Sequence, residues 1–182
     1  STGKLGSSLV KYCIKEKLDV FAITGYKNTK KLKSQSKKLN LNFYFNLYEN
    51  SQKNIFIKFL SKYRFKIVYF LDYGSYSLNY INVILKYNSN TSIAIANKEM
   101  IIAGGKFLIN KIHKTSNYLI PLDSEHFSLQ KSNFIENQIE KVFITASGGP
   151  FYFQKKINLN KVKTNSALKH PKWKMGINNS ID

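Results

Sequence analysis

Short apolar runs separated by amphipathic segments dominate the first 120 residues of this 182-residue chain. The runs Val20–Thr24, Ile67–Leu71 and Ser92–Ala96 are almost continuously apolar, which is typical of strands buried on both faces. The segments Ile55–Tyr63 and Leu78–Tyr87 instead have apolar residues at helical spacing. Buried strands that alternate with helices predict an α/β fold, with a doubly wound, mostly parallel sheet covered on both faces.

The same two kinds of element continue up to Pro121, where the pattern changes. Helices are predicted at Thr29–Leu39 and Met100–His113, and strands at Phe43–Phe45 and Tyr118–Pro121. We therefore expect one domain over residues 1–120 and the start of a second, α+β domain over residues 121–182. In that second part, a strand is predicted at Val142–Thr145 and an extended segment at Phe151–Lys156.

The net charge of +19 has two explanations. A strongly basic surface is typical of proteins that bind nucleic acids or membrane surfaces. Alternatively, AT-rich codons enrich Lys, Asn, Ile, Phe and Tyr together. Nucleic-acid surfaces usually use Arg for bidentate contacts, whereas Arg64 is the only arginine here and the lysines are scattered. We favour the second explanation and expect no nucleic-acid partner.

Two further features bear on the compartment. No apolar run approaches the roughly 20 residues that span a bilayer, so we expect no membrane partner. Cys13 is the only cysteine, which excludes a disulfide within the chain and fits a reducing compartment. A cytoplasmic location is expected, with a plastid-type compartment as the alternative.

A short glycine-rich turn opens the chain and leads into a predicted helix. The backbone N–H groups of such a turn can face a pyrophosphate, although plain strand–helix turns also contain two glycines. The strand that should precede this turn lies outside the chain. The turn consists of Thr2, Gly3, Lys4, Leu5 and Gly6.

Lys27 and Asn28 follow the strand Val20–Thr24, where dinucleotide-binding folds discriminate the adenosine ribose. An acidic residue at this place favours NAD. A lysine and an amide suit a 2′-phosphate instead, and so favour NADPH. The alternative is a solvated loop.

Asn97, Lys98 and Glu99 stand at the end of the strand Ser92–Ala96. Ligands bind at this end of strands in open α/β sheets, so the three side chains could meet a cofactor or a substrate anion. The alternative is a helix start that is capped by Asn97 and has Glu99 at the positive end of its dipole.

Two carboxylates, Asp123 and Glu125, follow the strand that ends at Pro121. Hard oxygen ligands suit Mg²⁺ or Mn²⁺, and an extended backbone would direct both carboxylates to one shared cation. The alternative is again a helix start, with Asp123 as the N-cap. We expect His126 to have a structural role, or to contact a metal-binding side chain without binding the metal itself.

Two loop motifs close the chain. Ser147, beside Gly148 and Gly149, could form an anion-binding nest, or the glycines could simply make a turn. The loop at residues 167–176 contains an imidazole, an indole and a thioether. This combination is typical of a lid over a ligand, whereas the alternative has Trp173 filling the edge of a core.

Taken in order, these motifs resemble the 1-deoxy-D-xylulose 5-phosphate reductoisomerase family, over nearly the whole chain. The resemblance implies an enzyme that uses NADPH and a divalent metal, Mn²⁺ or Mg²⁺. It would rearrange and reduce a phosphorylated sugar, 1-deoxy-D-xylulose 5-phosphate, to 2-C-methyl-D-erythritol 4-phosphate in isoprenoid precursor biosynthesis. The matching segments are Ser-Thr-Gly-x-Leu-Gly, Ala-Asn-Lys-Glu, Pro-Leu-Asp-Ser-Glu-His, Thr-Ala-Ser-Gly-Gly-Pro-Phe and Ala-Leu-Lys-His-Pro-x-Trp-x-Met-Gly.

The resemblance implies a Rossmann-like NADPH-binding domain over 1–120 and a partial catalytic, metal-binding domain with a lid loop over 121–182. Catalytic roles would fall to Lys98 and Glu125, and metal binding to Asp123 and Glu125. Substrate contacts are implied at Lys98, Ser124, Glu125, Ser147 and His170. NADPH contacts are implied at Thr2, Gly3, Lys4, Leu5, Lys27, Asn28, Asn97, Glu99 and Gly176.

The chain also departs from the family pattern. The family often has Gly directly before the Lys-Asn pair, whereas Tyr26 stands there in this chain. The family continues beyond the point matching Asp182 with a third metal-ligating Glu and a helical domain. We therefore expect this chain to be an N-terminal part of a homodimeric enzyme that lacks turnover by itself. A non-catalytic remnant that keeps the fold is the alternative.

Overall fold

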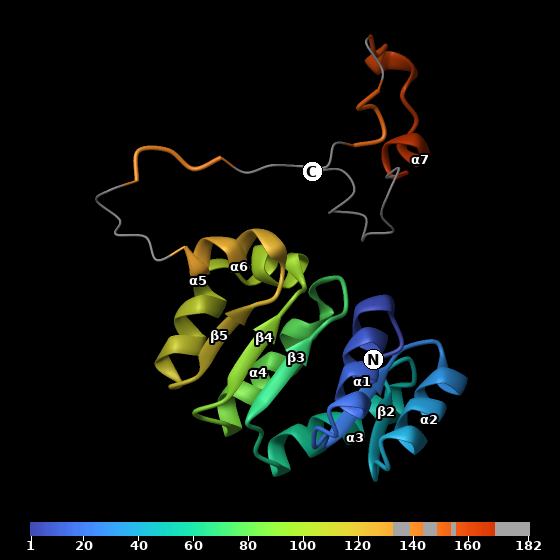
Figure 1. Cartoon of the computed structure of the whole chain (residues 1–182), viewed down its shortest axis with the longest axis vertical. Coiled ribbons are helices and arrows are strands. Elements are labelled where there is room, and N and C mark those ends of the chain that lie inside the picture. Colours follow the sequence, from blue (N-terminus) through green and yellow to red (C-terminus); the bar gives the residue numbers. More distant parts are fainter. Residues whose placement is uncertain (133–138, 144–148, 154–155, 170–182) are drawn as a thin grey trace.

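The computed structural model describes residues 1–132, 139–143, 149–153 and 156–169. Within them, five short strands form two parallel sheets (Figure 1). In the first sheet β1 (Ala22–Gly25) pairs with β2 (Phe43–Asn46), and in the second β4 (Ser92–Ile95) lies between β3 (Ile67–Phe70) and β5 (Tyr118–Pro121). These strands fall within a residue or two of the predicted ones, because each is a short apolar run.

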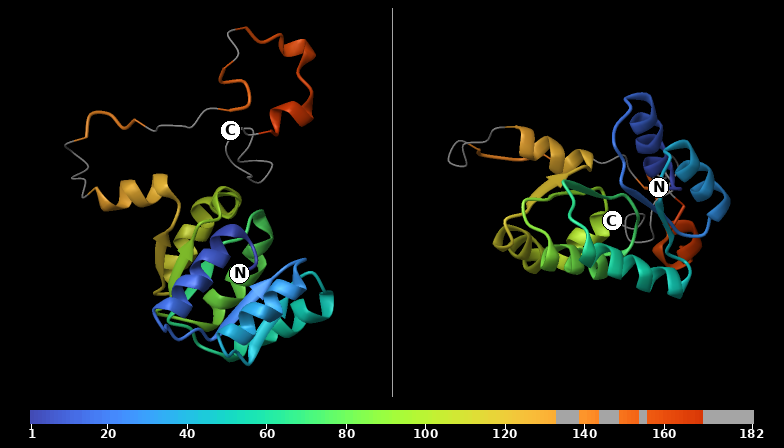
Figure 2. Two further views of the ribbon diagram at one scale, coloured as in Figure 1. Left: turned by 45° about the vertical axis from the view of Figure 1, so that its right-hand side comes forward. Right: turned by 90° about the horizontal axis from the view of Figure 1, so that it is seen from below.

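Helices connect the strands and cover both faces of the sheets, as expected for a doubly wound α/β fold. In the view from below, the first two helices lie on one side of the strands and the next three on the other (Figure 2). The helices of the sheet-forming part are α1 (Lys4–Lys15), α2 (Thr29–Lys38), α3 (Asn50–Lys62), α4 (Leu78–Tyr87), α5 (Lys98–Lys114) and α6 (Ser124–Lys131). Shorter helical turns are η1 (Ser75–Ser77), η3 (Leu159–Lys161) and α7 (Thr164–Ala167).

The strands of the described residues form two separate parallel sheets, because β1 and β3 are not paired with each other. Among the residues that the structure describes, each of these two strands has a hydrogen-bonded strand neighbour on one side only. One more parallel strand between them would complete the strand order of a doubly wound dinucleotide-binding sheet. At this edge of β1, the Ser1 nitrogen donates a hydrogen bond to the Thr24 carbonyl.

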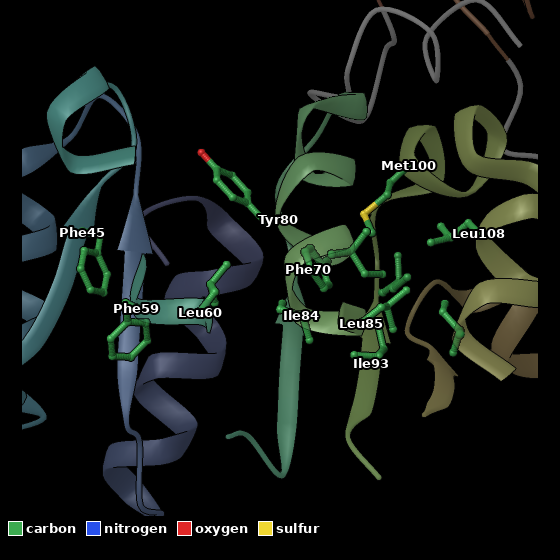
Figure 3. Close-up of a cluster of buried hydrophobic side chains, with 13 residues drawn as sticks. Phe45, Phe59, Leu60, Phe70, Tyr80, Ile84, Leu85, Ile93, Met100 and Leu108 are labelled. Atoms are coloured by element: carbon green, nitrogen blue, oxygen red, sulfur yellow. The ribbon is translucent and has the colours of Figure 1, made fainter. Parts of the chain in front are cut away.

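A single hydrophobic core nevertheless joins the two sheets, and α3 bridges them (Figure 3). The ring of Phe59 in α3 lies 5.0 Å from the rings of both Phe43 and Phe45 in β2. The next residue, Leu60, belongs to the same buried cluster as Phe70 of β3. Burying each such side chain stabilises the fold by roughly 1.5–3 kcal/mol. The crossover helix therefore holds the sheets together where strand pairing does not.

Three local predictions differ from the structure. Helix α3 begins at Asn50 rather than Ile55, because the apolar spacing marks only the buried part of the helix. Helix α5 contains a kink at Gly105, whose φ of +48° is outside the helical range.

No helix in the described part of the chain is long and apolar enough to cross a membrane.

The third difference lies after β5. Residues 151–153 form a turn, with a 3.1 Å hydrogen bond from Tyr152 N to Gly149 O, so the predicted extended segment Phe151–Lys156 is wrong there. Val142 and Phe143 are not in a strand, and the rest of the strand predicted at Val142–Thr145 lies outside the described residues.

Candidate functional site

The polar residues predicted to act together lie at one edge of the second sheet. Because β4 and β5 are parallel, their carboxyl ends meet at the same edge, where Ile95 pairs in register with Pro121. Helix α5 begins at Lys98, just after β4, and α6 begins at Ser124, just after β5. This topology brings the Asn97–Glu99 and Asp123–Glu125 segments to one place.

The side chains of Asn97 and Glu99 bind the protein's own backbone. Asn97 is 1% exposed; its amide oxygen caps α5 by accepting from Met100 N at 2.9 Å, and its amide nitrogen donates to Gly74 O at 2.8 Å. Glu99 is also buried and accepts from Gly74 N at 3.3 Å. The predicted capping role of Asn97 is confirmed, and both residues hold the turn after β3. Their contact with NADPH stays a prediction.

Gly74 is the residue in this turn that the sequence interpretation undervalued. Its φ is +81°, a conformation that a side chain disfavours. A lone glycine just after a buried strand was the available signal that the backbone turns there.

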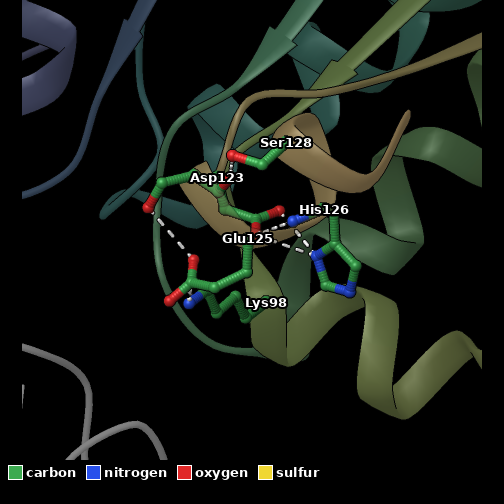
Figure 4. Close-up of polar contacts among 6 residues, drawn as sticks. Lys98, Asp123, Glu125, His126 and Ser128 are labelled. Atoms are coloured by element: carbon green, nitrogen blue, oxygen red, sulfur yellow. Dashed lines mark hydrogen bonds and ion pairs between the residues drawn. The ribbon is translucent and has the colours of Figure 1, made fainter. Parts of the chain in front are cut away.

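Lys98 and Glu125 form an ion pair across the two strand ends, with 2.9 Å between Lys98 Nζ and Glu125 Oε2 (Figure 4). The same oxygen of Glu125 accepts from Ser124 Oγ at 3.1 Å. The pKa of Glu125 is lowered to about 2, chiefly by the hydrogen bond from Lys98 and next by a backbone N–H. This carboxylate therefore stays ionised at all physiological pH values.

Asp123 is the N-cap of α6 and faces a different partner. Its carboxylate accepts from His126 N at 3.1 Å and lies 2.8 Å from His126 Nδ1. Figure 4 shows the Asp123 carboxylate at His126 and the Glu125 carboxylate at Lys98. The expected convergence on one cation is therefore not formed: each carboxylate has its own cationic or N–H partner. The described residues contain no group of three His, Cys, Asp or Glu side chains that could hold a metal ion.

The glycine-rich turn leads directly into α1, as predicted. Gly3 is the N-cap of α1 and, having no side chain, provides no cap hydrogen bond. A Cβ on Gly6 would lie 2.7 Å from Ser1 Cα, so this position requires glycine for the close approach of the backbone. A helix start without a side-chain cap leaves backbone N–H groups to be satisfied by water or by an anion.

The ribose-discriminating segment lies beside this turn. Asn28 caps α2, with its side-chain oxygen accepting from Lys31 N at 3.0 Å. The Lys31 ammonium in turn donates to the Thr2 carbonyl at 2.9 Å. Lys27 lies over the ring of Tyr48, 5.7 Å from its centre. Lys31 was not predicted at this site. The sequence feature that could have identified it is its position one helical turn after Asn28.

Three predicted site residues cannot be placed. Ser147, His170 and Gly176 lie outside the described residues, as do Trp173 and Met175 of the predicted lid. Lys4 and Leu5 stand in the first turn of α1, where Leu5 is 52% exposed.

Known proteins are similar to this chain in sequence and in fold. The family model of the 1-deoxy-D-xylulose 5-phosphate reductoisomerase C-terminal domain matches residues 119–182. A reductoisomerase of that name from Pelagibacter ubique (strain HTCC1062) is 36% identical over 205 aligned residues, covering 100% of this chain and 52% of the relative. The chain thus spans about half the length of the curated relatives it matches over its whole length.

Two solved structures share the fold. The reductoisomerase from Zymomonas mobilis, solved in complex with NADPH, superposes with a TM-score of 0.76 over 93% of this chain and 50% of that one, at 22% identity. A second reductoisomerase, solved with NADPH, fosmidomycin and magnesium, superposes with a TM-score of 0.73 over 100% of this chain and 52% of that one, also at 22% identity.

Proposed function

This chain belongs to the 1-deoxy-D-xylulose 5-phosphate reductoisomerase family, and on that basis we propose that it carries the NADPH site and one side of the catalytic site of such an enzyme. The reaction would rearrange and reduce 1-deoxy-D-xylulose 5-phosphate to 2-C-methyl-D-erythritol 4-phosphate. The observation that supports this most directly is the meeting of Lys98 and Glu125, 2.9 Å apart, at the carboxyl ends of two neighbouring strands.

The carboxylates at this site could supply part of the ligand set of a hard divalent cation. Mg²⁺ is usually held by one or two carboxylates, with water and substrate oxygens completing six ligands. Asp123 and Glu125 supply two such carboxylates at one helix start. Once bound, the metal would polarise substrate oxygen atoms as a Lewis acid. Either Mg²⁺ or Mn²⁺ would suit these oxygen ligands.

The residues around this pair would bind and orient the substrate. The Lys98 ammonium carries up to three donors, so it can pair with Glu125 and still meet a substrate oxygen. Ser124 Oγ already points to the Glu125 carboxylate and could donate to a substrate oxygen instead. Ser147 and His170 are proposed as further substrate contacts at its phosphate end.

The NADPH site would be built from the uncapped start of α1 and the lysines beside it. Thr2 and Gly3, with the first turn of α1, would face the pyrophosphate, and Lys27 the 2′-phosphate. When bound, NADPH supplies the hydride of the reduction. Asn97 and Glu99 would act by keeping the Gly74 turn in place beside the nicotinamide end, with Gly176 approaching the cofactor from the other side.

We propose that residues 1–120 form the cofactor domain and residues 121–182 part of the catalytic domain, a division supported by the family-model match that begins at residue 119. Homodimerisation and a cytoplasmic location are proposed as well. Because the chain spans only about half the length of the relatives it matches over its whole length, the 182 residues by themselves are expected to show no turnover.

Binding experiments on the chain test this proposal. Nicotinamide fluorescence should change saturably as the chain is titrated into NADPH. Electron paramagnetic resonance should detect bound Mn²⁺, and Glu125→Gln should weaken that binding about tenfold. Glu16→Gln is the matched control, because Glu16 pairs with Lys15 far from the site. Failure to bind NADPH, or equal Mn²⁺ binding by the wild type and Glu125→Gln, would contradict the assignment.

A further inference from the structure

Two exposed tyrosines stand together at the carboxyl edge of the first sheet. Tyr26 directly follows β1 and Tyr48 lies two residues after β2; these strands are parallel neighbours, with Gly25 in register with Asn46. The two rings are 5.2 Å apart at an interplanar angle of 81°, an edge-to-face contact. Tyr26 is 50% and Tyr48 56% exposed, so both rings keep much of their surface in solvent.

This pair is separate from the aromatic core. The rings that fill the core, such as Phe45 and Phe59, are about 5% exposed and come from the strand and helix interiors. Within the described residues, Tyr26 and Tyr48 contact each other and make no aromatic contact with that cluster. A packed but half-exposed aromatic pair at a strand end is a surface on which a planar ligand can stack.

Positive charge lies next to the two rings. The Lys27 ammonium is 5.7 Å from the centre of the Tyr48 ring. Lys31 Nζ reaches the Thr2 carbonyl, which connects this surface to the glycine-rich turn. The neighbouring acidic residue, Glu49, is engaged by Asn46 Nδ2 at 2.8 Å. The site therefore offers a phosphate the Lys27 ammonium beside the rings and the Lys31 ammonium at the glycine-rich turn, while one oxygen of Glu49 already accepts a hydrogen bond.

We propose that Tyr26 and Tyr48 form the stacking surface for the adenine of a 2′-phosphorylated adenine nucleotide, with Lys27 and Lys31 holding its 2′-phosphate. The inference rests on the proposed NADPH function and names the residues that would recognise the adenosine end. The oxygen of Asn28 is already used as the cap of α2. Asn28 would thus position the lysines rather than bind the phosphate through that oxygen.

Calorimetric binding of adenosine 2′,5′-bisphosphate, which contains the adenosine end without the nicotinamide, tests the proposal. Stacking on an aromatic side chain contributes about 1–3 kcal/mol per base, so Tyr26→Ala and Tyr48→Ala should each raise the Kd at least fivefold. Tyr48→Phe should bind like the wild type. Tyr87→Ala is the matched control, because Tyr87 also has a lysine over its ring but ends α4.

A second arm tests the charges. Wild-type protein should prefer adenosine 2′,5′-bisphosphate to adenosine 5′-monophosphate, and Lys27→Met or Lys31→Met should reduce that preference about tenfold. Circular dichroism checks that each variant is folded. If NADPH binds but the tyrosine variants change its affinity less than twofold, the stacking surface is refuted while the enzyme assignment stands. If neither nucleotide nor NADPH binds, both proposals fail.

Discussion

Lys98 Nζ lies 2.9 Å from Glu125 Oε2, which ties the start of α5 to the start of α6. The two residues come from different strand ends and meet only because β4 and β5 are adjacent and parallel. In this arrangement a protein cation stands against one of the two carboxylates proposed to bind a metal. Lys98 and a divalent cation would therefore compete for Glu125.

Removing the lysine should raise the pKa of Glu125. In Lys98→Met, this pKa should move from about 2 towards the ordinary glutamate value of 4.5, because the hydrogen bond from Lys98 is the largest cause of the shift. A pKa lowered by folding adds stability that is present above pH 4.5 and is lost as the pH falls towards 2. The exposed pair contributes at most about 1 kcal/mol.

NMR titration of the Glu125 carboxyl carbon measures this pKa, and acid unfolding measures the stability. Lys86→Met serves as a control, since Lys86 lies over the Tyr87 ring rather than beside Glu125. An unchanged Glu125 pKa in Lys98→Met would show that the ion pair does not form in solution.

Substitutions of Asp123 should separate its capping role from metal binding. Asp123→Ala removes the side chain that accepts from His126 N and should cost about 1 kcal/mol of unfolding free energy. Asp123→Asn caps a helix nearly as well, so it should stay within about 0.5 kcal/mol of the wild type. Both variants should lose Mn²⁺ affinity. Urea unfolding and Mn²⁺ titration decide the point; full Mn²⁺ affinity in Asp123→Asn would remove Asp123 from the metal site.

Gly6→Ala should destabilise the protein although alanine usually favours a helix. The new Cβ would lie 2.7–2.9 Å from three backbone atoms of Ser1, so the turn must shift, at a cost of about 1–3 kcal/mol. Gly3→Ser should be neutral or slightly stabilising, because its Cβ meets nothing within 4 Å and serine is a good N-cap. Thermal unfolding compares the two; equal midpoints would mean that the close approach at Gly6 is absent.

Tyr80→Phe should leave the protein as stable or up to about 1 kcal/mol more stable. Tyr80 is 4% exposed and its hydroxyl has no hydrogen-bond partner within the described residues (Figure 3). Its pKa is raised to about 12, mainly by burial. Tyr73→Phe, at a residue that is 73% exposed, should change little. A clear loss of stability in Tyr80→Phe, measured by denaturant unfolding, would show that the hydroxyl has a partner.

The sequence by itself determined the order and type of the elements from α1 to β5. Short apolar runs rich in β-branched and aromatic residues, such as Ile67–Phe70, indicate strands, and the helical spacing between them indicates the crossover helices. It also indicated the caps at Asn97 and Asp123, since capping depends on neighbours three positions away along the chain, whereas the cap at Asn28 was not predicted.

Only the tertiary structure decided how distant residues meet. Strand pairing, and not local sequence, brings Lys98 to Glu125. It also brings Asn97 and Glu99 within hydrogen-bond distance of the Gly74 backbone. It separated the strands into two sheets joined by the α3 core, and it placed Tyr26 against Tyr48. These contacts depend on the packing of the whole core, because a side chain far along the chain is a neighbour only after the strands between have found their partners.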